Sequence, residues 1–292
     1  MSERPILVTG ATGKLGRLVV ERLLARGQPV RVFTRRPETA RALFGETLQI
    51  AAGDFGDRAA LDTAVRGVGR LLLLSPISTR LVTDQVAVAD AAVAANVARI
   101  VKISGSDWTI EPPGNSISGE AHAAVERHLN GLPTEAVSLR PNAWMQVSLA
   151  NTIRNAIANS QVVAANLDAG IGYIDARDIA DVAVHQLLAD RIRGRTLNLT
   201  GPDVVSFRQV AALLTAALKR PVAALEKPPQ TVPKEGDFEH RAVAQFVRLI
   251  ASGRAARTTD VVPTLLGRSP RTVADFILEQ VTAETAVPEY QP

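Results

Sequence analysis

The 292-residue sequence predicts a doubly wound α/β fold, a parallel sheet covered by helices on both faces, followed by a smaller and partly helical C-terminal lobe. In the first half, short apolar runs without alternation are separated by amphipathic segments, the pattern of strands that are buried on both sides. The first run leads directly into a glycine-rich turn, VTGATGKLG at residues 8–16. After about residue 142 the regular alternation loosens, which indicates a second structural region.

Each element of the first half has its own local signal. The helix after the turn carries four apolar residues on one face and ends at Gly27. Pro37 begins the next helix, because the first turn does not need the N–H that proline lacks. Strands and helices alternate in the order Pro5–Thr9, Leu15–Arg26, Val30–Thr34, Pro37–Phe44, Leu48–Ala52, Arg58–Val65, Arg70–Leu74, Asp84–Asn96, Arg99–Ser104, Glu120–Leu129 and Ala136–Arg140.

The second half mixes helices with short strands. Helical periodicity predicts Val147–Ala158, Ile179–Ala189, Phe207–Leu218 and Val243–Ala251, and β-rich runs predict Gln161–Ala165, Gly172–Ile174 and Thr196–Thr200. The Pro/Lys-rich segment Lys227–Gly236 reads as a loop. We therefore expect a nucleotide-binding domain at 1–141 and a substrate lobe at 142–292, with some segments returning to the first domain.

Composition excludes several classes of protein. Hydrophobic residues make up 46% and charged residues 21%, as in ordinary globular proteins. The net charge of +4 is spread over scattered arginines, and aromatic residues are only 4%, so we expect no nucleic-acid partner. Cysteine is absent, which excludes disulfides and thiolate chemistry and suits a cytoplasmic location. No apolar run reaches the length of a signal peptide or membrane span, so no membrane partner is expected.

The glycine turn predicts a phosphate-binding site. Gly10 permits the tight turn, Gly13 lets a phosphate approach, and Gly16 lets the helix lie against the strand. Backbone N–H groups at the start of the helix, from Leu15, would face the phosphates. Thr12 and Lys14 add a hydroxyl and a cation beside the same anion. The alternative is a tight turn without a ligand.

The end of the second strand indicates which dinucleotide is bound. An acidic residue at this position would hold the ribose 2′-hydroxyl of NAD, but here Arg35 and Arg36 stand there, 19 and 20 residues after Gly16. A guanidinium binds a 2′-phosphate in bidentate fashion. NADPH is therefore expected, with NADH as the less favoured cofactor; the alternative is that both arginines are solvated loop residues.

The ends of the third and fourth strands complete the expected adenine side. Asp54 is placed to accept from the adenine amino group, with Phe55 near the ring, although Asp54 could equally cap the following turn. The run Leu74, Ser75 and Pro76 would form the floor beneath the adenine ribose.

The motifs TGATGKLG, TRRP, GDFGD, LLLLSP, KISGSDW and LRPNAW together resemble the NmrA-like group of atypical short-chain dehydrogenase/reductases. The likeness extends from about Pro5 to Phe276, because YIDARDIADVA and LLGRSPRTVADFI also look like the group's pattern. The group includes NADPH-dependent quinone reductases, dye reductases, isoflavone-reductase-like enzymes and NADP-binding regulators without catalysis. The resemblance implies a Rossmann domain with the glycine turn on the pyrophosphate, Arg35 on the 2′-phosphate and Asp54 near adenine.

Catalysis is where the sequence departs from its relatives. Typical short-chain dehydrogenases use a Tyr-x-x-x-Lys pair after an upstream serine; here Ser118 and His122 occupy the pair's positions, and Ser104 remains at the serine position. The chain's two tyrosines, at 173 and 290, form no such pair. His122 is the expected general acid, since an imidazole can carry a proton near neutral pH, or else it positions the loop on the nicotinamide side.

Several apolar residues are expected to contact substrate. Trp108, in the loop after the fifth strand, would form an aromatic wall or anchor the loop. The stretch from Pro141 resembles the group's lining of nicotinamide and substrate: Asn142 could bond the carboxamide or the acceptor, and Trp144 and Met145 give a flat apolar surface or core packing. Tyr173 opens a strand-to-helix turn near the same substrate.

Two aspartates follow Tyr173 in the sequence. Asp175 and Asp178 read as caps of the following helix. They lack histidine partners at metal-ligand spacing, so no metal is expected.

These features predict an NADPH-dependent oxidoreductase that reduces a planar, conjugated or aromatic acceptor such as a quinone, dye, imine or aromatic metabolite. Such acceptors demand little of a proton donor, because the product anion is delocalised or the acceptor is already positive. The alternative is a non-catalytic NADP(H)-binding redox sensor. Apart from a small-molecule substrate, the expected partner is none or a second copy, as a monomer or homodimer.

Overall fold

The computed structural model describes residues 4–46, 48–192, 194–228, 232 and 237–285. The chain divides into two compact units. Unit 1 comprises residues 1–141 and 179–198, and unit 2 comprises residues 142–178 and 199–292.

Unit 1 is built on a seven-stranded sheet in the order β3-β2-β1-β4-β5-β6-β9. The pairs from β3 through β6 are parallel. The strands are β1 (Ile6–Thr9), β2 (Val30–Thr34), β3 (Gln49–Ala52), β4 (Arg70–Leu73), β5 (Arg99–Ile103), β6 (Glu135–Pro141) and β9 (Thr196–Leu199). Chain order reverses direction between β1 and β4, which is the switch point where this kind of sheet binds ligands. The predicted doubly wound α/β fold is confirmed.

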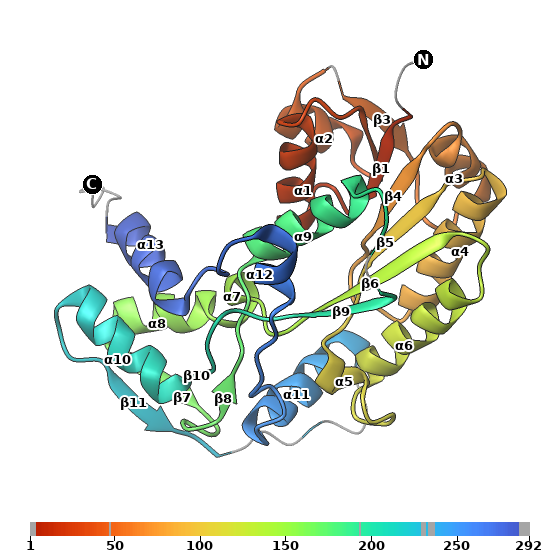
Figure 1. Cartoon of the computed structure of the whole chain (residues 1–292). Helices are drawn as coiled ribbons and strands as arrows, with labels where there is room; N and C mark the ends of the chain where they lie inside the picture. Colours follow the sequence, from red (N-terminus) through yellow and green to blue (C-terminus); the bar gives the residue numbers. More distant parts are fainter. Residues whose placement is uncertain (1–3, 47, 193, 229–231, 233–236, 286–292) are drawn as a thin grey trace. The chain divides into compact units, whose positions relative to one another are not determined.

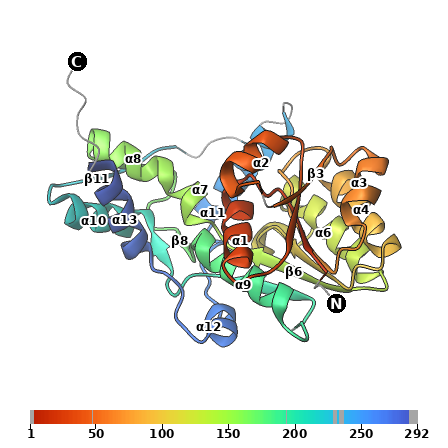
Figure 2. The same cartoon turned by 90° about the horizontal axis from the view of Figure 1, so that it is seen from above.

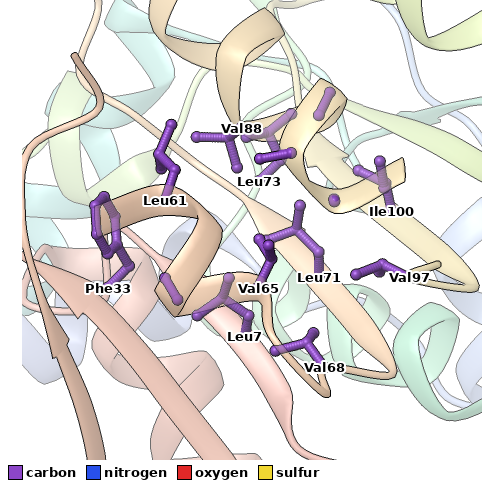
Figure 3. Packing of buried hydrophobic residues seen from close by; sticks show 14 of the residues in the cluster. Leu7, Phe33, Leu61, Val65, Val68, Leu71, Leu73, Val88, Val97 and Ile100 are labelled. Atoms are coloured by element: carbon purple, nitrogen blue, oxygen red, sulfur yellow. The ribbon is translucent and has the colours of Figure 1, made fainter. Parts of the chain in front are cut away.

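Helices cover both faces of this sheet, with α1, α2 and α9 on one side and α3, α4 and α6 on the other (Figures 1 and 2). The helices of unit 1 are α1 (Lys14–Leu24), α2 (Pro37–Phe44), α3 (Arg58–Val65), α4 (Leu81–Ala94), α5 (Asp107–Ile110), α6 (Ile117–Asn130) and, from Ile179 onward, α9 (Ala176–Leu188). On one face, Leu61 and Val65 of α3 pack against Leu7 of β1 and Leu71 of β4 in a continuous apolar cluster (Figure 3). Unbroken apolar strands are required here because both faces are removed from water.

Unit 2 carries two small sheets and six helices within the described residues. Strand β7 (Gln161–Ala164) pairs in parallel with β11 (Ala223–Glu226), and β8 (Gly170–Ile171) pairs antiparallel with β10 (Val205–Ser206). The helices are α7 (Met145–Ser148), α8 (Ala150–Asn159), α10 (Phe207–Leu218), α11 (Phe238–Ala251), α12 (Val261–Leu266) and α13 (Val273–Thr285).

Two predictions for the second half need correction, and several elements were not predicted. The strand expected at Gly172–Ile174 is wrong, because the strand in this region is β8, which ends at Ile171. Gly172 instead packs against the backbone of Arg257, so closely that a Cβ on Gly172 would lie 1.9 Å from the Arg257 carbonyl oxygen. The single helix Val147–Ala158 is two helices that meet at Leu149. Six elements, β8, β10, β11, α12 and α13 and, in the first half, α5, lie outside all predicted ranges. Most of the predicted loop Lys227–Gly236 lies outside the described residues.

Candidate active site

The glycine turn joins β1 to α1 at the switch point. Gly10 has φ +64°, and a Cβ there would lie 2.9 Å from the Leu74 carbonyl oxygen. A Cβ on Gly16 would lie 2.2 Å from the Gly10 carbonyl oxygen, so only glycine lets α1 approach the turn this closely. A Cβ on Gly13 would meet the same oxygen at 3.3 Å. The Thr9 side chain fixes the end of β1 to the residue that follows β4. Its hydroxyl donates to the Leu74 carbonyl at 2.8 Å and accepts from the Leu74 N–H at 2.8 Å.

The first turn of α1 is suited to an anion. Its N-cap is Gly13, which has no side chain to cap the N–H groups, and its first turn holds no acidic residue. Lys14 and Leu15 begin the helix, with Lys14 exposed and Leu15 buried, while Thr12 is half-buried. The uncapped helix end attracts negative charge through its amides and its dipole. These residues fit the pyrophosphate of a dinucleotide.

Arg35, Asp54 and Arg80 lie together at the carboxyl ends of β2 and β3. An Arg35 Nη atom is 3.9 Å from one Asp54 oxygen, and Arg80 Nη2 is 3.2 Å from the other. The Asp54 carboxylate also accepts from the Gly56 N–H at 2.9 Å, and this bond, with the two guanidiniums, lowers the pKa of the Asp54 carboxyl. Asp54 therefore does hold the following turn, and it stays ionised beside two cations.

Arg35 is 73% exposed and remains available to a 2′-phosphate. Arg36 is also exposed, and its N–H donates to Thr34 Oγ1 at 3.0 Å just before α2. Arg80 is a second guanidinium at the same place, and the sequence does not predict it. Only the folded structure shows that Arg80 lies beside Asp54, because Arg80 follows β4 and is 26 residues from Asp54 along the chain.

The remaining adenine-side residues are partly accessible. Phe55 is half-buried and its ring packs on Phe33 with centroids 5.7 Å apart. Leu74 is half-buried, Ser75 Oγ accepts from Gln85 Nε2 at 2.9 Å, and Pro76 is exposed. The structure thus brings the predicted floor of the ribose to the end of β4, beside Gly10.

His122 is buried in α6, 6% exposed, and its Nδ1 lies 2.9 Å from Nζ of Lys102 on β5. Burial, with the nearby Lys102 charge, holds the pKa of the His122 imidazole well below its usual 6.5. Burial likewise lowers the pKa of Lys102 from 10.5 to about 7, against an opposing effect of Glu126. The expectation that His122 itself carries a proton near neutral pH is therefore corrected: desolvation keeps the ring neutral.

Ser104 belongs to a second buried group. Its hydroxyl donates to Glu126 Oε1 at 2.6 Å, and Arg140 Nη2 pairs with Glu126 Oε2 at 2.5 Å. Arg140 Nη1 also pairs with Glu111 at 2.7 Å. Since the Ser104 proton is committed to Glu126, the geometry gives Ser104 a structural bond rather than proton donation to substrate. Ser118, at the position of the usual tyrosine, is hydrogen-bonded to Ser116 at 2.9 Å.

Trp108 is 1% exposed within α5. Of the two predicted roles, the buried ring fits the anchor of the loop and not an open aromatic wall. Next to it, Ser106 Oγ donates to the Pro141 carbonyl at 2.7 Å, which ties this loop to the end of β6.

The other predicted substrate residues belong to unit 2. Asn142 Nδ2 donates to the Ala255 carbonyl at 3.1 Å, and its Oδ1 accepts from Ala143 N at 2.7 Å. Trp144 is half-buried, and its backbone forms an isolated parallel β-bridge with Ile174. Met145 and Tyr173 are fully buried at 0% and 1% exposure, so both pack as core; burial also raises the pKa of Tyr173.

The two aspartates of unit 2 are buried ion-pair partners. Asp175 pairs with Arg177 at 2.6 Å, and Asp178 pairs with Arg271 at 2.6 Å and with Arg268 at 2.8 Å. Within the described residues no group of three or more His, Cys, Asp or Glu side chains could hold a metal ion. In the same part of the chain, no helix is long and apolar enough to span a bilayer.

Residues 10–190, more than half of the chain, match the family described as NAD(P)H-binding. The chain belongs to this family. Its sequence is 33% identical over 291 residues to the (4-alkanoyl-5-oxo-2,5-dihydrofuran-3-yl)methyl phosphate reductase of Streptomyces griseus, covering 97% of this chain and 100% of that protein. It is 31% identical over 284 residues to the NAD(P)H azoreductase of Xenophilus azovorans, covering 93% and 96%.

A solved structure shares the fold over nearly the whole chain. The NADPH-dependent quinone oxidoreductase of Escherichia coli, complexed with NADPH, superposes with a TM-score of 0.81 at 25% identity over 96% of this chain and 99% of that one. The predicted membership of the NmrA-like atypical short-chain dehydrogenase/reductases is confirmed. NAD(P)H binding follows from the family, in agreement with the glycine turn.

Lys102 is the clearest residue that the sequence prediction missed. Its signal was present, because a lysine interrupts the apolar strand IVKIS, where a charge is costly to bury. What could not be seen is its partner, since His122 is 20 residues away on a different element.

Proposed function

We propose that this protein is an NADPH-dependent reductase that transfers hydride to a planar, conjugated acceptor such as a quinone, an azo or triarylmethane dye, or an imine. The observation that carries the proposal is that His122, aligned with the lysine of the usual Tyr-x-x-x-Lys pair, is buried and neutral, while Ser118 stands at the tyrosine position. Such a site lacks the acidic tyrosine hydroxyl that protonates a localised alkoxide, so it suits acceptors whose reduction leaves a delocalised or neutral product. The names of its azoreductase and quinone oxidoreductase relatives agree with this class.

Different residues of unit 1 would bind different parts of NADPH. The turn at Gly10–Gly16 and the first turn of α1 would hold the pyrophosphate, and Arg35 with Arg80 would hold the 2′-phosphate. When bound, NADPH supplies the hydride at its nicotinamide ring. The carboxyl end of β5 and the start of α6, where Gly105 and His122 lie, would then border the acceptor, because ligands in this fold sit outside the carboxyl ends of the strands.

The test is NADPH consumption by the purified protein with benzoquinone, an azo dye, a cationic triarylmethane dye and a cyclic imine. Cofactor binding is titrated in parallel by fluorescence. We expect turnover with at least one of these acceptors, faster with NADPH than with NADH. Tight NADPH binding without turnover on any acceptor would replace this proposal with the second candidate, a redox sensor, which the missing Tyr-x-x-x-Lys pair favours.

A further inference from the structure

Lys102 is a fully buried amine in the middle of the sheet. It lies on β5 between Leu73 of β4 and Ser138 of β6, its partners in the parallel register, and its exposure is 0%. Nζ is 2.9 Å from His122 Nδ1 and 3.2 Å from the Ile103 carbonyl oxygen. A side chain that served only to fill this strand would cost less free energy as an apolar residue.

The bond between Lys102 and His122 has a direction when the amine is charged. An ammonium group only donates, so His122 Nδ1 accepts and the ring proton must sit on Nε2. Among the described residues, the His122 ring makes no other hydrogen bond. A Cβ on Gly105 would lie 2.8 Å from His122 Cδ2, so only a glycine at the end of β5 lets the backbone pack this closely against the ring.

The charges around the pair do not neutralise it. Glu126 faces it from α6 and Arg140 from β6, but Glu126 is held by Arg140 at 2.5 Å and by Ser104 at 2.6 Å. No carboxylate of the described residues lies within ion-pair distance of Nζ. On the β4 side the register partner is Leu73, which is apolar. The buried ammonium is therefore weakly held in its charged form, as a proton store requires.

We propose that Lys102 stores the proton consumed in the reduction and delivers it to the acceptor through His122. This inference rests on the proposed reductase function. In reduction of a quinone, the acceptor gains a hydride and one proton, and NADPH is oxidised to NADP⁺. As negative charge develops on the acceptor oxygen, the Nε2–H proton of His122 moves to that oxygen. The Lys102 ammonium transfers a proton to Nδ1. After the product leaves, solvent protonates Nε2 and Nδ1 returns its proton to the Lys102 amine, which restores the starting charges and tautomer.

This relay predicts a dependence on the chemistry of the acceptor. A quinone needs the proton, whereas a cationic triarylmethane dye becomes neutral on accepting hydride and needs none. Lys102 thus matters for one acceptor and not for the other. A purely structural lysine would affect both acceptors alike.

The experiment compares these two acceptors in the wild-type protein, in Lys102→Met and in the control Lys219→Met, whose lysine is exposed at the end of α10. We expect Lys102→Met to lower kcat for the quinone by about 100-fold, the smaller end of general-acid effects. For the dye, which needs no proton, we expect kcat to change by less than about threefold in Lys102→Met. Lys219→Met should change neither rate.

The wild-type pH profile gives a second readout that needs no variant. Because the donor must be protonated, quinone turnover should fall about tenfold per unit above the Lys102 pKa of about 7, while dye reduction should not follow this profile. Matching pH profiles for the two acceptors would overturn the relay and leave the reductase intact. No turnover of either acceptor by the wild-type protein would overturn both.

Nuclear magnetic resonance tests the pair without turnover. In the protein without cofactor, Lys102 Nζ should titrate near pH 7, and the His122 ring should remain neutral, with its proton on Nε2 below pH 7, where the amine is charged. A Lys102 that stays charged through pH 9, or a ring proton on Nδ1 below pH 7, would overturn the proposal.

Discussion

Replacing Lys102 by methionine should remove a large part of the rise in the free energy of unfolding between pH 7 and pH 9. In the unfolded chain the amine has its ordinary pKa of 10.5, and in the folded protein burial lowers this pKa to about 7. Between these two values the unfolded state binds a proton that the folded state lacks. The free energy of unfolding therefore rises with pH in this window, and the destabilising effect is fully present below pH 7.

The magnitude follows from the two pKa values. Well inside the window the slope is about 1.4 kcal/mol per pH unit, and from pH 7 to pH 9 the rise integrates to about 2 kcal/mol. Methionine has a similar length and no proton to lose, so Lys102→Met should lack this rise. Methionine should also stabilise the fold at pH 6, where the wild-type protein carries the full cost of the buried ammonium.

The assay is urea denaturation at pH 6, 7, 8 and 9, followed by the fluorescence of Trp108. Trp108 lies in the same unit as Lys102, and Trp144→Phe in both proteins removes the other tryptophan. The stability advantage of Lys102→Met at pH 6 should shrink by about 2 kcal/mol between pH 7 and 9. Stability curves for the two proteins that run parallel across this range would refute the lowered pKa of Lys102.

Three further substitutions test other parts of the site. Gly16→Ala should lower the free energy of unfolding by about 1–3 kcal/mol and weaken NADPH binding, because its Cβ would lie 2.2 Å from a backbone oxygen. The control is Gly131→Ala, where the atom nearest to the new Cβ is at 3.4 Å. Equal effects of the two substitutions would contradict the close approach of α1 to the glycine turn. Arg35→Ala should raise the Kd for NADPH by about 10- to 100-fold and change NADH binding little, since it removes a charge-assisted bond to the 2′-phosphate. The exposed Arg58→Ala serves as its control in calorimetric titrations, and an equal loss for both cofactors would exclude the 2′-phosphate role. His122→Gln should remove the loss of stability below pH 6.5, because only the unfolded ring gains a proton there; unchanged acid denaturation in the variant would mean that the native ring does titrate.

The fold of unit 1 could be predicted because local sequence and tertiary structure agree there. Most of its strands are mainly apolar runs, and several helices have a boundary signal, such as Pro37 at the start of α2. In unit 2 the strand β10 is only two residues long, too short for a periodic pattern. Gly172 shows the same limit, since its conformation is set by contact with the distant Arg257 carbonyl.

The candidate site was predictable where a motif is continuous in sequence. The turn from Gly10 to Gly16 is one segment, and Arg35 stands at a fixed distance from it. The ionisable pairs are different, because Lys102 with His122, and Arg80 with Asp54, join residues 20 and 26 positions apart. Their proximity depends on how β5, α6 and the loops after β3 and β4 meet, and burial then alters the pKa of His122 in a way that residue type alone does not indicate.

Hydride transfer from NADPH to a conjugated acceptor is the step on which the proposed function depends. The most direct measurement is mass spectrometry of the product formed from NADPH deuterated at C4 and a cationic triarylmethane dye or a cyclic imine, in which the new C–D bond does not exchange with water. We expect one deuterium in each molecule of reduced product, formed in step with NADPH consumption. Bound but unconsumed NADPH, with no deuterium in any acceptor, would contradict it.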